Sequence, residues 1–305
     1  MGLMGLMGSD PFNFDAAWLA LREPVDHRSR PAALLPLLAT AWRTHHWSQL
    51  LDLGSGTGSN LRYIASRLPG DQEWTLVDHD RDLLNHPIGA DATEPIRSVR
   101  RVHGGLADRG LAAVARAHLV TGSALLDLVS REWLRRLVEA CRSAGCGAHF
   151  ALTYDGEIQW FKGAGHGGGA DPDPDNDPDD ELVRLSVNAH QRGDKGLGPA
   201  LGPTASVVAE ALFRAAGYRT WLLASPWHLG PEDGQLARKL IDGWERAALQ
   251  LDDDPDHACR IQAWSVRRRR TIDSGAFGLS VGHQDLLALP ADPHPRPLPR
   301  GEGEN

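Results

Sequence analysis

Cysteine is scarce in this sequence of 305 residues: only Cys141, Cys146 and Cys259 occur, and none belongs to a C-x-x-C pair. So few cysteines argue against a disulfide framework and a zinc ribbon, and they are typical of a reducing cytoplasm. The sequence also lacks any run of about 18 apolar residues, which argues against a membrane-spanning helix. Positive charge is not in excess, because 32 Lys and Arg stand against 40 Asp and Glu. We therefore expect a cytoplasmic protein without a membrane or nucleic-acid partner and without a bound metal.

Short β-type runs alternate with amphipathic helical stretches along most of the chain. This alternation predicts an α/β fold, doubly wound, with a mostly parallel sheet and helices on both faces. Strands are expected at 49–53, 73–78, 99–103, 118–122, 149–154, 220–224 and 279–289. Helices are expected at 14–22, 29–43 and 60–68, near Asp80, and at 131–144, 203–216, 232–249 and 255–270.

The ends of the chain are unlike its middle. Residues 1–13 are expected to be flexible, and the proline-rich tail at 290–305 is expected to be disordered. A single domain is predicted between them at 14–289, opening with a helical segment at 14–48. The composition gives no indication of the oligomeric state.

Residues 163–181, "GAGHGGGADPDPDNDPDDE", are rich in glycine, proline and acids, which predicts a disordered, solvated surface loop. The spacing of the acids is close to that of a calcium loop, but Asn176 stands where the sharp-turn glycine belongs and Leu182 where the bidentate glutamate belongs. Arg267 to Arg270 end a predicted helix, where cations suit the helix dipole, and we expect them to be solvated.

The segment "LDLGSGTGSN" at 51–60 is the first with a chemical meaning. A strand that ends in a glycine turn before a helix brings backbone N–H groups close to an anionic or nucleotide-like ligand. The pattern is G-x-G-x-G, not the G-x-G-x-x-G of dinucleotide folds, because Ser59 stands where the third glycine of that fingerprint belongs. Asp78, at the end of the next strand, is placed to accept both hydroxyls of a ribose and to repel a 2′-phosphate.

These two segments, "LDLGSGTGSN" and "LVDHD", resemble motifs I and II of the Rossmann-like S-adenosylmethionine-dependent methyltransferases. The resemblance implies a seven-stranded sheet in the order 3-2-1-4-5-7-6 with the seventh strand antiparallel. It also implies S-adenosylmethionine as the cofactor and a small or medium-sized molecule as the methyl acceptor.

The resemblance assigns cofactor contacts by position. Asp52 and the glycine turn would hold the methionine part, Asp78 the ribose, and His79 the adenine, with Gly122 and Ser123 near the sulfonium. The full set of implied cofactor residues is Asp52, Gly54, Ser55, Gly56, Thr57, Gly58, Asp78, His79, Leu106, Gly122 and Ser123. In many members an acid meets the adenine amino group after the third strand, but here Gly105 and Leu106 occupy that place.

The acceptor pocket of an open α/β sheet forms beyond the carboxyl ends of its strands. That rule selects Ser123, Tyr154 and Asp155, and also the loop "HQRGDKG". In this loop His190, Asp194 and Lys195 are able to move a proton or bind an anionic substrate. His190 is predicted as the general base, with Tyr154 and Asp194 as further catalytic residues. Two alternatives stay open: a non-catalytic S-adenosylmethionine-binding regulator, and an NAD(P)-dependent oxidoreductase, which Ser59 disfavours.

Overall fold

The computed structural model describes residues 15–89, 95–163, 175–251 and 254–291. At its centre is one mixed sheet in the order β3-β2-β1-β4-β5-β8-β6, with the short β7 paired to β8. The strands are β1 (Gln49–Leu53), β2 (Gln72–Asp78), β3 (Ile96–His103), β4 (Leu119–Ser123), β5 (Gly147–Lys162), β6 (Tyr218–Ala224), β7 (Trp227–Leu229) and β8 (Phe277–Pro290). Neighbours among β1 to β5 pair in parallel, whereas β8 runs antiparallel to β5, β6 and β7. The predicted doubly wound fold, its strand order and its antiparallel last strand are confirmed, with β7 as an additional strand.

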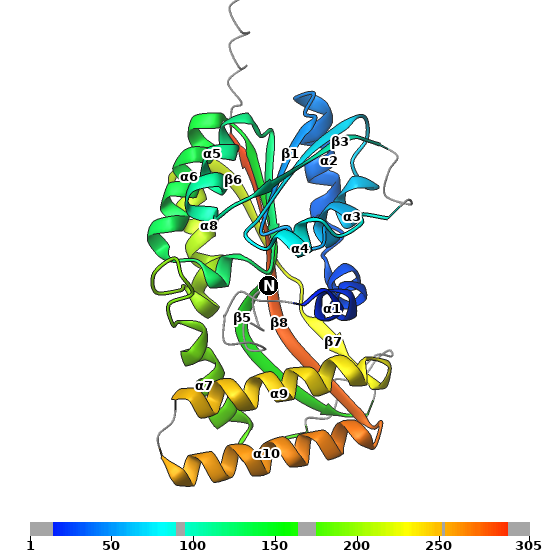
Figure 1. The fold of residues 1–305 in the computed structure, drawn as a ribbon, viewed down its shortest axis with the longest axis vertical. Coiled ribbons are helices and arrows are strands. Elements are labelled where there is room, and N and C mark those ends of the chain that lie inside the picture. The colour runs from blue at the N-terminus through cyan, green and yellow to red at the C-terminus, as the bar shows by residue number, and fades with distance from the viewer. Residues whose placement is uncertain (1–14, 90–94, 164–174, 252–253, 292–305) are drawn as a thin grey trace, which may run out of the picture.

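Helices cover both faces of this sheet (Figure 1). They are α1 (Ala16–Ser29), α2 (Leu34–Thr44), α3 (Ser59–Ala65), α4 (Arg81–Leu84), α5 (Leu111–Ala113), α6 (Arg131–Ala144), α7 (Asp180–Gln191), α8 (Ala205–Ala215), α9 (Gly234–Leu251) and α10 (Pro255–Asp273). In Figure 1, α2, α3 and α4 lie on one side of the strands, and α5, α6 and α8 lie on the other. No helix in the described part of the chain is both long enough and apolar enough to cross a bilayer.

The first helix is longer than the sequence predicts. The expected end at Arg22 rests on Pro24, which has no N–H for the helical ladder, yet α1 continues to Ser29 with Pro24 inside it. Trp18 and Val25 on α1 are buried in the same apolar cluster as β7 and α9. This burial offsets the lost hydrogen bond and keeps the helix continuous.

The strands β5 and β8 extend well past the other strands and carry α7, α9 and α10 along their lower half (Figure 1). The predicted strands at 149–154 and 279–289 are therefore too short. A large apolar cluster that includes Trp160, Trp244 and Trp264 fills the space between this extension and the three helices. The extension creates a second layer of structure beyond the carboxyl ends of the central strands.

The acidic stretch before α7 is not solvated where the structure describes it. Asp177 accepts hydrogen bonds from Arg267 at 2.5 and 2.7 Å, and Asp179 accepts from Arg260 and Arg267 at 2.8 Å each. Burial acts to raise the pKa of Asp177, but the hydrogen bonds from Arg267 and from the Asp179 amide, together with the charges of Arg267 and Arg268, hold that pKa below its usual value. The prediction of a disordered loop is thus wrong for 175–181; 164–174 lie outside the described residues.

Arg268 is likewise buried and not part of a solvated helix end. It donates to Asp175 at 2.9 Å and pairs with Asp180, and its guanidinium lies over the ring of Trp160 at 4.4 Å. The arginines at the end of α10 and the acids before α7 therefore neutralise each other. The predictions for 1–13 and for the tail fall outside the described residues, except that Pro290 ends β8 and Ala291 follows it.

Candidate functional site

The carboxyl ends of β1, β2 and β4 meet at the point where the strand order reverses, which is where open α/β sheets bind ligands. The predicted glycine turn lies there, after β1. Gly54, Gly56 and Gly58 all adopt a positive φ, of 63°, 52° and 85°. Other L-residues pay an energetic cost in this region, so the three glycines are needed for the path of the chain.

The amides of this turn are mostly engaged inside the protein. Gly54 and Ser55 both donate to the carbonyl of Val77, at 2.9 and 3.2 Å, and Gly58 donates to the carbonyl of Ser55 at 2.9 Å. Gly56 donates to Oδ2 of Asp78 at 2.7 Å. The expectation that these N–H groups are free for a ligand is therefore wrong for these four residues.

Asp78 is fully buried at the end of β2. Its Oδ2 accepts from Gly56, and its Oδ1 accepts from the amide of Asp80 at 2.9 Å. An ionised carboxylate accepts about four hydrogen bonds, so each oxygen keeps capacity for a further donor. His79 follows with a half-exposed ring, whose Nδ1 is 3.3 Å from Oδ1 of Asp78.

Asp52 ends β1 in a network of buried polar side chains. Its Oδ1 accepts from the Asn60 amide at 2.9 Å, and that amide also donates to Thr121 at 2.7 Å. Its Oδ2 has no hydrogen-bond partner, and neither has the buried hydroxyl of Ser55 in the turn. Burial raises the pKa of Asp52 to about 7, against the opposing effects of Asn60 and Arg30.

Arg30 connects this network to the far side of the sheet. It donates to Asn60 at 3.0 Å and to Asp285 of β8 at 2.9 Å, and the other oxygen of Asp285 accepts from the amide of Leu152 at 2.8 Å. Arg30 is almost fully buried. Its partner Asp285 is 255 positions away in the chain, so the pairing itself cannot be predicted from the sequence.

A small cavity of about 40 Å³ separates the glycine turn from α1. Leu19, Arg22 and Asp26 of α1 line one side, and the turn, Asn60 and Ser123 line the other. A Cβ added to Gly56 would be 3.1 Å from Leu19 Cδ1. Ligand pockets usually measure about 300–1,000 Å³, so α1 must move if a nucleoside is to bind at the turn.

Polar contacts hold α1 over the turn. Arg62 of α3 pairs with Glu23 at 2.6 Å and donates to the carbonyl of Thr57 at 2.7 Å. His27 is 3.1 Å from the Ser59 hydroxyl. These contacts are partly exposed, and contacts of that kind contribute little individually. The buried side chains of Trp18 and Val25, and the hydrogen bond from the Trp227 indole to Asp26 at 3.1 Å, hold α1 more firmly than these contacts do.

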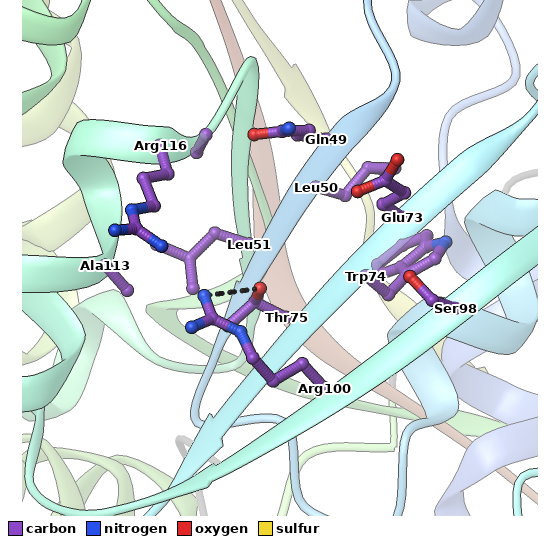
Figure 2. A pocket seen from close by; sticks show the side chains of 11 residues that line it. Gln49, Leu50, Leu51, Glu73, Trp74, Thr75, Ser98, Arg100, Ala113 and Arg116 are labelled. Atoms are coloured by element: carbon purple, nitrogen blue, oxygen red, sulfur yellow. Dashed lines mark hydrogen bonds between the residues drawn. The ribbon is translucent and has the colours of Figure 1, made fainter.

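A larger cavity of about 280 Å³ lies at the other end of the same strands (Figure 2). Gln49 and Glu73, at the beginnings of β1 and β2, line it, together with Arg100, whose guanidinium donates to the Thr75 hydroxyl at 3.2 Å. Ligands of doubly wound sheets bind beyond the carboxyl ends, so we assign the site to the glycine turn despite its smaller cavity.

The structure separates the three predicted catalytic residues. Tyr154 is fully buried and its hydroxyl donates to Asn188 Oδ1 of α7 at 2.8 Å; burial raises its pKa far above the usual range. His190 lies two residues after Asn188, so it points away from Tyr154, and its Nε2 is 3.0 Å from Gln250 of α9. Asp194 is exposed and accepts from the amides of Gly196 and Gly198, as a turn residue does.

The remaining predicted cofactor residues follow β3 and β4. Leu106 opens a short π-helical turn after β3, and its carbonyl accepts from the Trp133 indole at 3.2 Å. Gly122 is packed so tightly that a Cβ there would be 3.1 Å from the carbonyl oxygen of Leu53. Only Ser123 of these three lines the cavity at the turn.

Asp127 is a residue that the sequence interpretation missed. It lies four residues after β4 in the 3-10 turn Leu126–Leu128, is fully buried, and has no hydrogen-bond partner on either carboxylate oxygen. Burial raises its pKa to about 6, although Arg22 and Lys195 act in the opposite direction. The only sequence signal was an acid inside the apolar run "ALLDLV". Within the described residues, no group of three or more His, Cys, Asp or Glu is arranged to bind a metal.

Comparison with known proteins gives matches among solved structures only. No family model and no curated protein matches the sequence. A SAM-dependent methyltransferase from Geobacter sulfurreducens, in complex with S-adenosylhomocysteine, is 15% identical over 90% of this chain and 98% of its own, with a TM-score of 0.39. An O-methyltransferase family protein from Burkholderia thailandensis is 16% identical over 68% of this chain and 54% of its own, with a TM-score of 0.42. A cyclopropane synthase from Mycobacterium tuberculosis is 10% identical over 91% and 95%, with a TM-score of 0.43.

The strand order, with an antiparallel β8 between β5 and β6, is the order that the sequence resemblance implied. With identities of 10–16% and TM-scores below 0.5, these three likenesses carry no functional argument, so the residues of the site carry it.

Proposed function

We propose that this protein binds S-adenosylmethionine at the glycine turn and transfers its methyl group to a small or medium-sized molecule. The observation that carries the proposal is the turn itself: three glycines with positive φ follow β1 at the reversal of strand order, flanked by the buried carboxylates of Asp52 and Asp78. The unpaired Oδ2 of Asp52 and the unpaired Ser55 hydroxyl are polar groups that a bound ligand would satisfy.

The residues at the turn fit this cofactor in kind. Asp52 and Ser55 offer acceptors to its amino-acid part, and Asp78 retains acceptor capacity for the ribose hydroxyls. His79 is assigned to the adenine, and Ser123, which lines the cavity at the turn, to the sulfonium. Leu106 and Gly122 complete the assignment by position. Binding requires α1 to leave the turn, since the cavity between them is far smaller than a nucleoside.

The bound cofactor supplies an electrophilic methyl group and a good leaving group for an in-line displacement. The protein has to hold the acceptor in line and exclude water, and orientation alone supplies up to about 7–11 kcal/mol. The second layer built on β5, β8, α7 and α9 lies beyond the carboxyl ends of the central strands, and we assign the acceptor to the space between the two layers. Free thiols at Cys141, Cys146 and Cys259 support a cytoplasmic location.

Calorimetry with S-adenosylhomocysteine tests the cofactor assignment. We expect micromolar binding by the native protein and none by Asp78→Ala or Gly56→Ala. Gly70→Ala is the matched control, because Gly70 also has a positive φ, of 77°, and has open space around it. This variant therefore carries the same backbone strain as Gly56→Ala but does not alter the glycine turn. Equal binding by Gly56→Ala and Gly70→Ala would remove the assignment.

A second candidate function is a cofactor-binding regulator without turnover. The separation of His190, Tyr154 and Asp194 favours it, because no preformed trio of these groups is present. Methyl transfer to any acceptor in a protein that binds S-adenosylhomocysteine decides against this candidate. An oxidoreductase would instead bind NADH, which a fluorescence titration detects.

A further inference from the structure

The carboxylate of Asp127 differs from the other buried acids of the described chain. Asp26, Asp52, Asp78, Asp179 and Asp285 are also buried, and each accepts at least one hydrogen bond from a side chain or a backbone amide. Asp127 accepts none from any other described residue, and only its own backbone amide acts on the carboxylate as a hydrogen-bond donor. A buried charge without hydrogen bonds is costly, so its retention calls for a partner that binds there.

The cationic side chains around Asp127 do not fill this role. Arg22 pairs with Asp26 at 2.8 Å, and its guanidinium lies over the Trp227 ring at 5.0 Å. Lys195 is buried and its pKa is lowered by desolvation, with only partial compensation from Asp127. Neither cation is within ion-pair distance of Asp127 among the described residues.

The chain neighbours of Asp127, Leu126 and Leu128, are buried apolar residues. Its neighbour Leu128 packs in the same buried cluster as Tyr154 and Trp227. His283 connects these two rings, with its centroid 4.9 Å from that of Trp227 and 6.2 Å from that of Tyr154. A buried carboxylate without a partner attracts a cationic ligand with N–H groups and repels an anion.

The place of Asp127 in the fold connects it with the proposed reaction. Ser123, at the end of β4, faces the cofactor cavity, and the chain reaches Asp127 four residues later. Tyr154 lies three residues past the part of β5 that pairs with β4, and the charge of Asp127 makes a small contribution to raising the pKa of Tyr154. Asp127 therefore lies between the cofactor turn and the second layer.

We propose that Asp127 binds the nitrogen of an amine acceptor and takes up the proton that this nitrogen loses before methylation. The inference rests on the proposed function. An ammonium group would donate to the carboxylate, and transfer of one proton to Asp127 would free the nitrogen lone pair. The lone pair then forms the new N–C bond with the methyl carbon, while the C–S bond breaks and its electron pair stays on sulfur. The product is a methylated ammonium ion, and the proton on Asp127 leaves to solvent.

The test compares the native protein with Asp127→Asn, which preserves the shape of the side chain and removes its charge. Glu132→Gln is the control, since Glu132 is an exposed acid five residues further on that pairs with Arg135. Each protein is assayed for S-adenosylhomocysteine binding by calorimetry. Labelled methyl transfer from S-adenosylmethionine is measured to ethanolamine, glycine and putrescine, with ethylene glycol and glycolate as hydroxyl counterparts.

We expect transfer to at least one amine and to neither hydroxyl counterpart. Asp127→Asn should bind S-adenosylhomocysteine as the native protein does but lose at least about 100-fold in amine methylation. With S-adenosylhomocysteine bound, the accepted amine should raise the melting temperature of the native protein and of Glu132→Gln, but not that of Asp127→Asn.

Several outcomes would overturn the inference while leaving the proposed function intact. These are native turnover by Asp127→Asn, transfer to the hydroxyl compounds only, or no transfer to any amine by a protein that binds S-adenosylhomocysteine. Failure of the native protein to bind S-adenosylhomocysteine would instead overturn the proposed function, and the inference with it.

Discussion

Replacing Asp127 with Asn should stabilise the folded protein in a way that depends on pH. Burial raises the pKa of Asp127 from its ordinary value of 3.8 to about 6. The folded state therefore holds this proton more tightly than the unfolded state does. The free-energy cost of the buried charge is present in full at pH values above the pKa of the folded state. It disappears as the pH falls below the pKa of the unfolded state.

The magnitude follows from the two pKa values. A difference of about 2 between them corresponds to about 3 kcal/mol at pH 7.5, and about 1 kcal/mol of this remains at pH 4.5. Asparagine does not titrate, so its gain over the native protein should be about 2 kcal/mol larger at pH 7.5 than at pH 4.5. Any constant cost of an unpaired amide cancels from this comparison. The comparison leaves the charged and titratable neighbours of Asp127 unchanged. They are Arg22 of α1, Lys195 of the loop after α7, and Tyr154 of β5.

Urea unfolding followed by circular dichroism at the two pH values measures this difference. Glu132→Gln should behave oppositely, because the pKa of Glu132 is lowered by its hydrogen bond with Arg135, and removing that charge can only weaken the folded state. An equal effect of Asp127→Asn at both pH values would show that the carboxylate is paired in solution. The argument for an amine ligand at Asp127 would then lose its basis.

Three further predictions concern other parts of the molecule. S-adenosylhomocysteine should speed hydrogen exchange over Ala16–Ser29, since α1 must leave the turn; unchanged exchange with tight binding would contradict the displacement. Arg268→Met should lower the free energy of unfolding in urea by about 3–5 kcal/mol, because Arg268 is buried and its partners Asp175 and Asp180 would be left uncompensated. The control Arg238→Met, at an exposed arginine, should lower it by less than about 1 kcal/mol. His190→Ala should change methyl transfer less than about threefold, because its ring contacts Gln250 of α9; a loss of 100-fold would restore His190 as the general base.

The parts of the fold that the sequence predicts well are those fixed by local patterns. The segment from β1 through the glycine turn to Asp78 was predicted to within a residue or two at each end of its strands, because apolar runs, glycines and a strand-ending acid are adjacent in the chain. The short strand β7 was missed, since its three residues form a strand only by pairing with Leu279 to Val281 of β8. The length of β5 was missed for the same reason, because its second half pairs with β8 more than 100 positions later.

The residues of the proposed cofactor site differ in how far the sequence predicts their surroundings. Gly54 to Gly58 and Asp78 are local signals, but the internal hydrogen bonds of the turn and the cover by α1 depend on tertiary contacts. His190 and Asp194 satisfied the requirement for titratable groups at the right strand ends, yet helix geometry turns His190 toward α9 and a tight turn uses Asp194. A residue type in the right loop does not fix the direction of its side chain.

The contrast between Arg30 and Asp127 shows what a sequence cannot distinguish. Both are charged residues in segments that gave no functional pattern, and both are buried. Arg30 has three hydrogen-bonding neighbours and is explained by the network that joins α3, β5 and β8. Asp127 has no such neighbour. Replacing an unpaired buried charge stabilises the folded protein, so the presence of one is explained most simply by a ligand that it binds. Buried charges should therefore be judged by their unsatisfied atoms, and by that criterion Asp127 is the acid that the fold alone does not explain.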